Sequence, residues 1–162
     1  MAQRCRNIDV LGEAMNHRRT RLAVFLAAGV LLLSACGGSP GLAALDRAAT
    51  AQDELPADVE FSPGFEAASV RLLATENGLK FYAAQGADRR TVCLAVVSVE
   101  GPGGWTAGCG TLATAGTLVD VGSGPLEVSA ALTADGTTAE LMESDGWTKV
   151  HENVYIREFT AG

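Results

Sequence analysis

From about Ala68 to the C-terminus, the chain alternates between short apolar runs and turn signals. The runs SVRLLAT and LKFYAAQ flank Glu76-Asn77-Gly78. Asn-Gly between two such runs is the strongest short hairpin signal, because both residues tolerate positive φ angles. The pattern therefore predicts an antiparallel hairpin that turns at Asn77 and Gly78.

The same rhythm continues to the end of the chain. Further strands are predicted in the runs TVCLAVVSV, WTAGC, GTLVDVG, LEVSAAL, TAELMES, WTKV and NVYIREF. Turns separate these runs about every eight to twelve residues, and no helical period is evident after Leu55. We therefore expect an all-β fold over residues 61–162: an antiparallel meander of about eight or nine strands that closes as a small sandwich or barrel.

A different pattern occupies the beginning of the chain. The apolar stretch Leu22–Leu33 follows Arg18, Arg19 and Arg21, and it is too short to span a bilayer of about 30 Å. The residues LSAC, which end at Cys36, resemble the lipobox of bacterial lipoprotein precursors. This resemblance implies that diacylglycerol alkylates the Cys36 thiol and that the chain is cut just before it. A plain secretory signal, an uncleaved anchor helix and an ordinary core helix are the alternatives.

These patterns divide the chain into four parts. We expect residues 1–14 to be an extension upstream of the true start at Met15, and residues 15–35 to be a lipoprotein signal peptide that forms a signal helix. Residues 36–60 are rich in Gly, Ala, Ser and Pro, and as a coiled tether they would reach about 25 to 30 Å on average. The β-domain follows at 61–162. Two acyl chains on Cys36 anchor firmly, so the expected location is extracytoplasmic, on the outer face of the cell membrane.

The charge of the chain is divided as sharply as its hydropathy. From Cys36 onward there are seven Lys and Arg against seventeen Asp and Glu, although the formal net charge of the whole chain is only -7. Such an acidic surface is repelled by phosphate backbones, so we do not expect a nucleic-acid partner. The partner that we expect is the membrane, which the protein contacts through its N-terminal lipid.

The remaining cysteines pair by elimination. Cys5 lies in the discarded part and Cys36 carries the lipid, which leaves Cys93 and Cys109 in an oxidising compartment. They stand on consecutive predicted strands, with Gly101–Gly104 turning between them. A disulfide is therefore expected, worth on the order of 3 kcal/mol, with free or redox-active thiols as the alternative.

Several longer stretches carry a second resemblance. LDRAATAQDELP, SVRLLATENG, VCLAVVSVEGPGGWTAGCG, LTADGTTAELMESDG and ENVYIREF occur in this order between Leu45 and Phe159. Together they resemble a group of uncharacterised secreted or membrane-attached proteins of actinobacteria, with a Cys-Leu strand, a second Cys and an Asn-Val-Phe/Tyr ending. The likeness implies no activity, but it implies that Leu45–Pro56 belongs to the folded unit. Ala134 departs from the group, which tends to have Pro there.

Residues that would support catalysis are scarce. After Cys36 the chain has one histidine, His151, and no Gly-x-Ser-x-Gly elbow. A zinc site needs three or four Cys or His ligands, which a lone histidine beside a disulfide does not supply. His151 is therefore interpreted as a turn or strand-edge residue, and we expect neither an enzyme nor a metal nor a cofactor.

Acidic residues offer weaker candidates. Glycoside hydrolysis uses two carboxyl groups, and calcium sites use carboxylates in loops. No Asp-x-Asp-x-Asp-Gly loop is present, so solvated surface carboxylates are the preferred interpretation. The carboxylate pairs are Glu140 with Glu143 and Glu152 with Glu158, and the turn residues are Asp88, Asp135 and Asp145.

Trp105 and Trp147 are the candidate binding surface, because exposed tryptophans bind sugars and peptides, although most pack on a sheet. The function that we expect is a non-catalytic, lipid-anchored envelope protein that binds a protein or an envelope polymer. A small-ligand carrier or sensor with a barrel cavity is the first alternative. An unrecognised hydrolase is the second.

Overall fold

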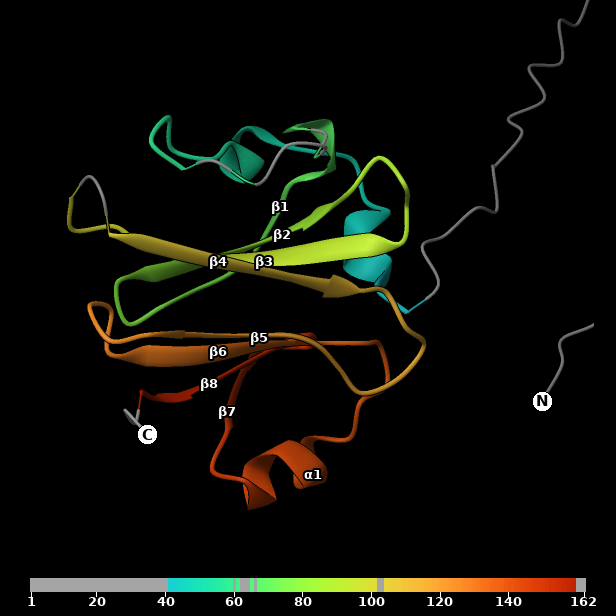
Figure 1. The fold of residues 1–162 in the computed structure, drawn as a ribbon, viewed down its shortest axis with the longest axis vertical. Coiled ribbons are helices and arrows are strands. Elements are labelled where there is room, and N and C mark those ends of the chain that lie inside the picture. The colour runs from blue at the N-terminus through green and yellow to red at the C-terminus, as the bar shows by residue number, and fades with distance from the viewer. Residues whose placement is uncertain (1–40, 60, 62–64, 66, 102–103, 160–162) are drawn as a thin grey trace, which may run out of the picture. The chain divides into compact units, whose positions relative to one another are not determined.

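The computed structural model describes residues 41–59, 61, 65, 67–101 and 104–159. In this part of the chain two four-stranded antiparallel sheets face each other as a sandwich (Figure 1). The first sheet has the order β1-β2-β3-β4, with strands Arg71–Glu76, Leu79–Gln85, Thr91–Ser98 and Trp105–Thr111. The second has the order β5-β6-β8-β7, with strands Thr117–Ser123, Val128–Thr133, Val154–Glu158 and Thr148–His151. The all-β, antiparallel prediction is confirmed, and the sheets take the sandwich form.

Three of the predictions fall on the part of the chain that precedes these elements. The extension over residues 1–14, the signal peptide over residues 15–35 and the lipid attachment at Cys36 all lie outside the described residues. Among the residues that are described, no helix is long and apolar enough to cross a bilayer.

The first hairpin turns where the sequence predicts. Asn77 and Gly78 have φ angles of 49° and 72°, and Glu76 pairs with Leu79 across the turn. Two consecutive positive φ angles match the twist of the flanking strands, which favours this short turn over a splayed one.

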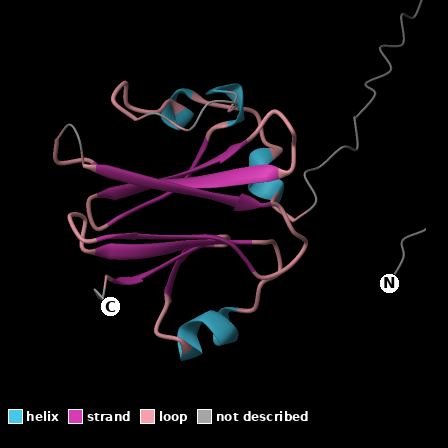
Figure 2. Ribbon diagram, in the orientation of Figure 1, coloured by secondary structure: helices cyan, strands magenta, loops and turns pink. Residues whose placement is uncertain are grey.

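One predicted strand is a helix. The residues TAELMES were expected to form a strand, but Ala139–Ser144 form α1, which covers the outer face of the second sheet (Figure 2). Ala, Leu, Met and Glu all favour helices, and positions three apart share one helix face. Ala139 and Met142 therefore both pack against the cluster around Tyr155. The prediction was wrong because, over so few residues, the apolar positions fit both the period of a helix and that of a strand.

The helix also changes the strand order. The chain leaves β6, crosses through α1 to the other end of the sheet and enters the edge strand β7, which runs in the same direction as β6, and β8 then inserts between them. In the first sheet each strand pairs with the next one in the sequence, as in a meander, whereas in the second sheet β6 pairs with β8.

Apolar side chains from both sheets fill the space between them. β2 and β3 contribute Phe81, Leu94 and Val96, while β6 and β8 contribute Leu132 and Val154, and all five are fully buried. This inner core is the largest apolar cluster of the described residues, and its burial is the main force that holds the two sheets together.

Strand β3 is buried on both of its faces. Val92, Leu94 and Val96 belong to the inner core, whereas Ala95 and Val97 belong to a second cluster on the outer face of the first sheet. Successive side chains of a strand point to opposite faces, so this outer face requires a cover of its own.

The N-terminal segment supplies that cover (Figure 2). Val59 and Val70 pack on the outer face of the first sheet, while Leu42 and Leu45 enter the inner core. The segment contains three single-turn 3-10 helices, namely η1 (Ala43–Leu45), η2 (Ala51–Asp53) and η3 (Ala67–Ser69). Residues 41–59 therefore do not form a coiled tether but pack on the sheets, as the resemblance implied for Leu45–Pro56.

The carboxylate of Asp53 fastens this segment to the first sheet. It is 3% exposed and accepts hydrogen bonds from Arg47 Nη1 and Nη2 at 2.7 and 2.5 Å and from the backbone N–H of Thr50 at 2.7 Å. It also accepts one from the backbone N–H of Leu72 in β1, at 2.7 Å. Arg47 donates in turn to the carbonyl oxygen of Leu72 at 3.1 Å. One buried charge thus satisfies donors from the segment and from the sheet edge.

Replacing Asp53 with Asn keeps the size of this side chain but removes its charge. We expect the free energy of unfolding to fall by about 2 to 3 kcal/mol, because charge-assisted hydrogen bonds are lost and an amide N–H₂ group is placed among donors. Urea denaturation followed by circular dichroism measures this. The exposed neighbour Glu54, changed to Gln, is the matched control and should cost less than about 0.5 kcal/mol. Equal losses in both variants would contradict the role of Asp53.

The same carboxylate makes the stability of the folded protein depend on pH. Its hydrogen bonds with Arg47, Thr50 and Leu72 lower the pKa of Asp53 in the folded protein, below the value of about 3.9 for an unfolded aspartate. The stabilisation is therefore complete above about pH 4 and is lost as the pH falls through the folded pKa. Urea titrations at decreasing pH should show that the difference in the free energy of unfolding between wild type and Asp53→Asn becomes smaller. A difference that stays constant in acid would overturn this account.

Candidate functional site

The two cysteines of the β-domain form the predicted disulfide. Cys93 in β3 and Cys109 in β4 are register partners with their Cα atoms 4.0 Å apart, and they are bonded to each other. Both alternate with inward-facing neighbours, so the disulfide lies on the outer face of the first sheet. The pairing is confirmed, and it is consistent with a location outside the cytoplasm.

The two tryptophans lie on opposite outer faces of the sandwich and do not form one surface. Trp105, at the start of β4, is half-buried in the cluster on the first sheet. Trp147 is only 7% exposed and packs with Met142 and Tyr155 on the second sheet. The Arg157 guanidinium lies 4.3 Å from the centroid of the Trp147 ring. Trp147 therefore has little surface left for a ligand.

His151 ends β7 and is half-buried near the β7–β8 turn. Its Nδ1 accepts a hydrogen bond from the backbone N–H of Asn153 at 3.2 Å. Burial lowers the pKa of the His151 imidazole, against a smaller opposing effect of Glu152. These contacts support the interpretation of His151 as a turn residue.

The acidic candidates do not gather into a site. Glu140 and Glu143 are exposed on α1. Glu152 precedes β8 and Glu158 ends it, so that pair is separated by the length of the strand. In the described part of the chain no three His, Cys, Asp or Glu residues come close enough to hold a metal ion.

The turn aspartates serve the backbone. Asp88 Oδ1 accepts hydrogen bonds from the N–H groups of Arg90 and Thr91, both at 2.9 Å, and these bonds lower its pKa. Asp135 accepts one from the N–H of Ala43 at 2.7 Å and one from Asn153 Nδ2 at 2.9 Å. Both carboxylates therefore hold the fold together.

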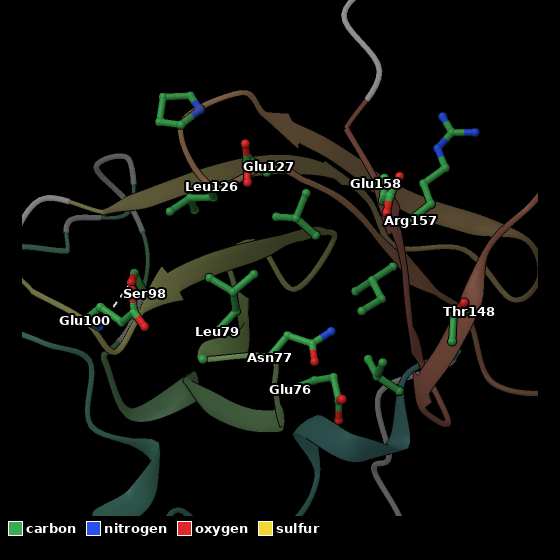
Figure 3. A pocket seen from close by; sticks show the side chains of 15 residues that line it. Glu76, Asn77, Leu79, Ser98, Glu100, Leu126, Glu127, Thr148, Arg157 and Glu158 are labelled. Carbon is green, nitrogen blue, oxygen red and sulfur yellow. Dashed lines mark hydrogen bonds between the residues drawn. The ribbon is translucent and has the colours of Figure 1, made fainter.

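A cleft of about 500 Å³ lies at one end of the sandwich. It opens between the β1–β2 hairpin of the first sheet and the β5–β6 turn of the second, beside the end of β8 (Figure 3). Here the inner core reaches the surface. The apolar floor consists of Leu79, Leu126, Val128, Val150 and Ile156.

The rim of this cleft is acidic. Glu76 ends β1, Glu127 lies in the β5–β6 turn and Glu158 ends β8, while Glu100 follows β3. The one cation of the lining, Arg157, points away from the hollow in Figure 3. Its guanidinium lies over the ring of Trp147. An apolar floor inside a ring of carboxylates favours a ligand that combines apolar and positively charged groups.

None of these residues stands out in the sequence by itself. The signal lies in the strand order, because in an antiparallel meander the connections after β1, β3 and β5 fall at the same end of the sheets. Each of these three connections carries or adjoins a glutamate, at Glu76, Glu100 and Glu127. Grouping the charged residues by whether they follow an odd-numbered or an even-numbered strand therefore predicts an acidic end.

Comparisons of the chain with protein-family models, with curated proteins and with solved structures find no match. The geometry of the chain itself therefore carries the functional argument.

The difference in burial between the two tryptophans can be measured directly. Trp147→Phe leaves Trp105 as the sole tryptophan, and Trp105→Phe leaves Trp147. We expect acrylamide to quench the fluorescence of Trp105 more strongly, because Trp147 is covered by Met142 and Arg157. Circular dichroism checks that both variants are folded. Stronger quenching of Trp147 would restore it as a binding surface.

Proposed function

We propose that this protein is a non-catalytic binding domain, anchored outside the cytoplasm by a lipid on Cys36, which holds a basic, apolar segment of a partner protein in the cleft between the β1–β2 and β5–β6 turns. The observation that carries the proposal is the cleft itself, with its apolar floor and its ring of glutamates.

The anchor is supported by the sequence and by the redox state of the domain. Three arginines, an apolar stretch of signal-peptide length and LSAC stand in the order that lipoprotein precursors require. The Cys93–Cys109 disulfide is consistent with export. The resemblance to secreted or membrane-attached actinobacterial proteins points the same way.

Three features of the cleft support a peptide ligand over the alternatives. Its volume of about 500 Å³ lies in the range of pockets that bind organic ligands, which is large enough for one or two apolar side chains. The space between the sheets is filled by the inner core, which favours a ligand at the end of the sandwich over one enclosed in a barrel. Lys or Arg residues flanking the apolar side chains would meet the glutamates of the rim.

The contacts of Ser98 support a non-catalytic role. Ser98 is the lining residue that most resembles a catalytic nucleophile, because it carries a primary hydroxyl group. Its Oγ accepts a hydrogen bond from the backbone N–H of Glu100 at 3.1 Å. A serine nucleophile requires a base within hydrogen-bond reach. The lining of the cleft contains neither His nor Lys, so it lacks a Ser–His or Ser–Lys pair, and its carboxylates are exposed on the rim.

The anchor is tested by changing Cys36 to Ala in the full chain expressed in an actinobacterium. We expect the wild type to partition with membranes and to have the mass of a chain that begins at Cys36 and carries diacylglycerol. The variant should lose both properties. Cys5→Ala is the matched control, because that cysteine lies in the expected discarded part. A wild-type protein without added mass would refute lipidation.

The cleft is tested with two synthetic peptides, each with a Leu-Leu pair flanked by either Lys or Glu residues. We expect the mature protein to bind only the Lys peptide, with binding that weakens as salt is added. Loss of two rim charges in Glu127→Gln/Glu158→Gln should weaken binding by about three- to tenfold, as measured by calorimetry. The double variant Glu140→Gln/Glu143→Gln on α1 removes the same charge away from the cleft and should have little effect. Equal weakening in both double variants would mean that only net charge matters.

A further inference from the structure

The first described residues are fixed at one particular end of the sandwich. The carbonyl oxygen of Gly41 accepts the N–H of Asp135 at 2.8 Å, and the N–H of Ala43 donates to Asp135 Oδ2 at 2.7 Å. Gly41 also lies against the backbone of Ala113, so closely that a Cβ atom would clash with it. Leu42 is fully buried in the inner core. The chain therefore enters the domain beside the β4–β5 and β6–α1 connections.

This entry end is opposite to the cleft. β6 begins at Val128, which lines the cleft, and the chain reaches Asp135 just beyond the other end of that strand. Seven steps of about 3.3 Å separate the two residues by roughly 23 Å. Figure 1 shows the β5–β6 turn on the left and the β4–β5 connection on the right, at opposite ends of the sandwich.

Only residues 37–40 stand between Cys36 and Gly41. Whatever their conformation, five steps along a chain span at most about 18 Å. This reach is shorter than the roughly 23 Å between the two ends of the sandwich. A lipid on Cys36 therefore keeps the entry end within about 18 Å of the membrane surface, too close for the domain to stand inverted on its cleft end.

We infer that the anchored domain stands on its entry end, with that end against the phospholipid headgroups and the cleft facing away from the membrane. This inference rests on the proposed lipidation of Cys36. It specifies the side from which a partner protein must approach.

The side chains at the entry end fit such a contact. The β4–β5 connection, residues 112–116, carries no charged residue. Arg89 and Arg90 are exposed in the β2–β3 turn at the same end, where the carbonyl oxygen of Arg90 accepts the N–H of Leu112 at 2.7 Å. Guanidinium groups bind phosphate oxygens well. The partner surface that suits them is a leaflet that contains anionic phospholipids.

The acidic groups support the same orientation. The cleft end carries Glu76, Glu100, Glu127 and Glu158, which an anionic leaflet repels. The entry end carries Asp46, Asp88, Asp135 and Glu152, but Arg89 and Arg90 at the same end offset part of their charge. Repulsion is therefore stronger at the cleft end.

Fluorescence energy transfer to labelled headgroups tests the orientation. Two exposed threonines serve as matched labelling sites for a clickable amino acid, Thr114 at the entry end and Thr148 beside the cleft. The lipidated protein is placed on phosphatidylcholine vesicles with phosphatidylglycerol. We expect transfer from residue 114 to exceed that from residue 148 by about twofold, since the ends differ in height by roughly 23 Å. Equal or reversed efficiencies would overturn the orientation.

The intact mass of the protein separates this test from that of the anchor. Absence of a diacylglyceryl mass would refute the anchor, whereas its presence with equal transfer would refute only the orientation. The geometry is also measured on a chain beginning at Cys36, to which a two-chain maleimide lipid is coupled. Because Cys93 and Cys109 are bonded to each other, Cys36 is the thiol available for coupling.

The contribution of the arginines is tested by Arg89→Gln/Arg90→Gln. In the wild type we expect transfer from residue 114 to rise when phosphatidylglycerol replaces part of the phosphatidylcholine. The double variant should lose most of that rise, whereas Lys80→Gln, a cation in β2 near the cleft end, should retain it. A rise that persists in the arginine variant would show that the tether alone sets the orientation and would refute the headgroup contact.

Discussion

The burial of strand β3 on both faces is the constraint on which the rest of this structure depends. A sheet with a central strand that is apolar on both faces needs a cover on each side. The second sheet covers one face, and the N-terminal segment covers the other. Because this segment must cross the first sheet, the chain is already folded at Gly41, and Asp53 and Asp135 fasten it there. The short link to Cys36 follows from the packing of the core.

The antiparallel order of the strands then gives the domain two different ends. Connections alternate between the ends of a meander, so glutamates that are scattered in the sequence gather around one opening of the inner core. The other end holds the entry of the chain and the exposed pair Arg89 and Arg90. The proposed anchor at the second end and the proposed ligand at the first therefore do not compete for the same surface.

Local signals in the sequence were sufficient for part of this picture. Asn77-Gly78 fixes its hairpin through its own φ preferences, and Cys93 and Cys109 pair because a short turn brings their strands together. Leu42 and Leu45 gave no such local signal, since two leucines in a stretch rich in alanine do not reveal what they pack against. The helix α1 was hidden because its six residues fit two periods. The cleft depends on which strands adjoin, which no local pattern contains.

Hydrogen–deuterium exchange of the lipidated protein tests the central claim that the two ends have separate partners. On anionic vesicles, compared with detergent micelles, amides of residues 112–116 should exchange more slowly while those around Asn77 and Glu127 stay unchanged. Addition of a basic, apolar peptide should then slow exchange around Asn77 and Glu127 and leave 112–116 as they were. Protection of the cleft end by the vesicles, or of the entry end by the peptide, would contradict the account.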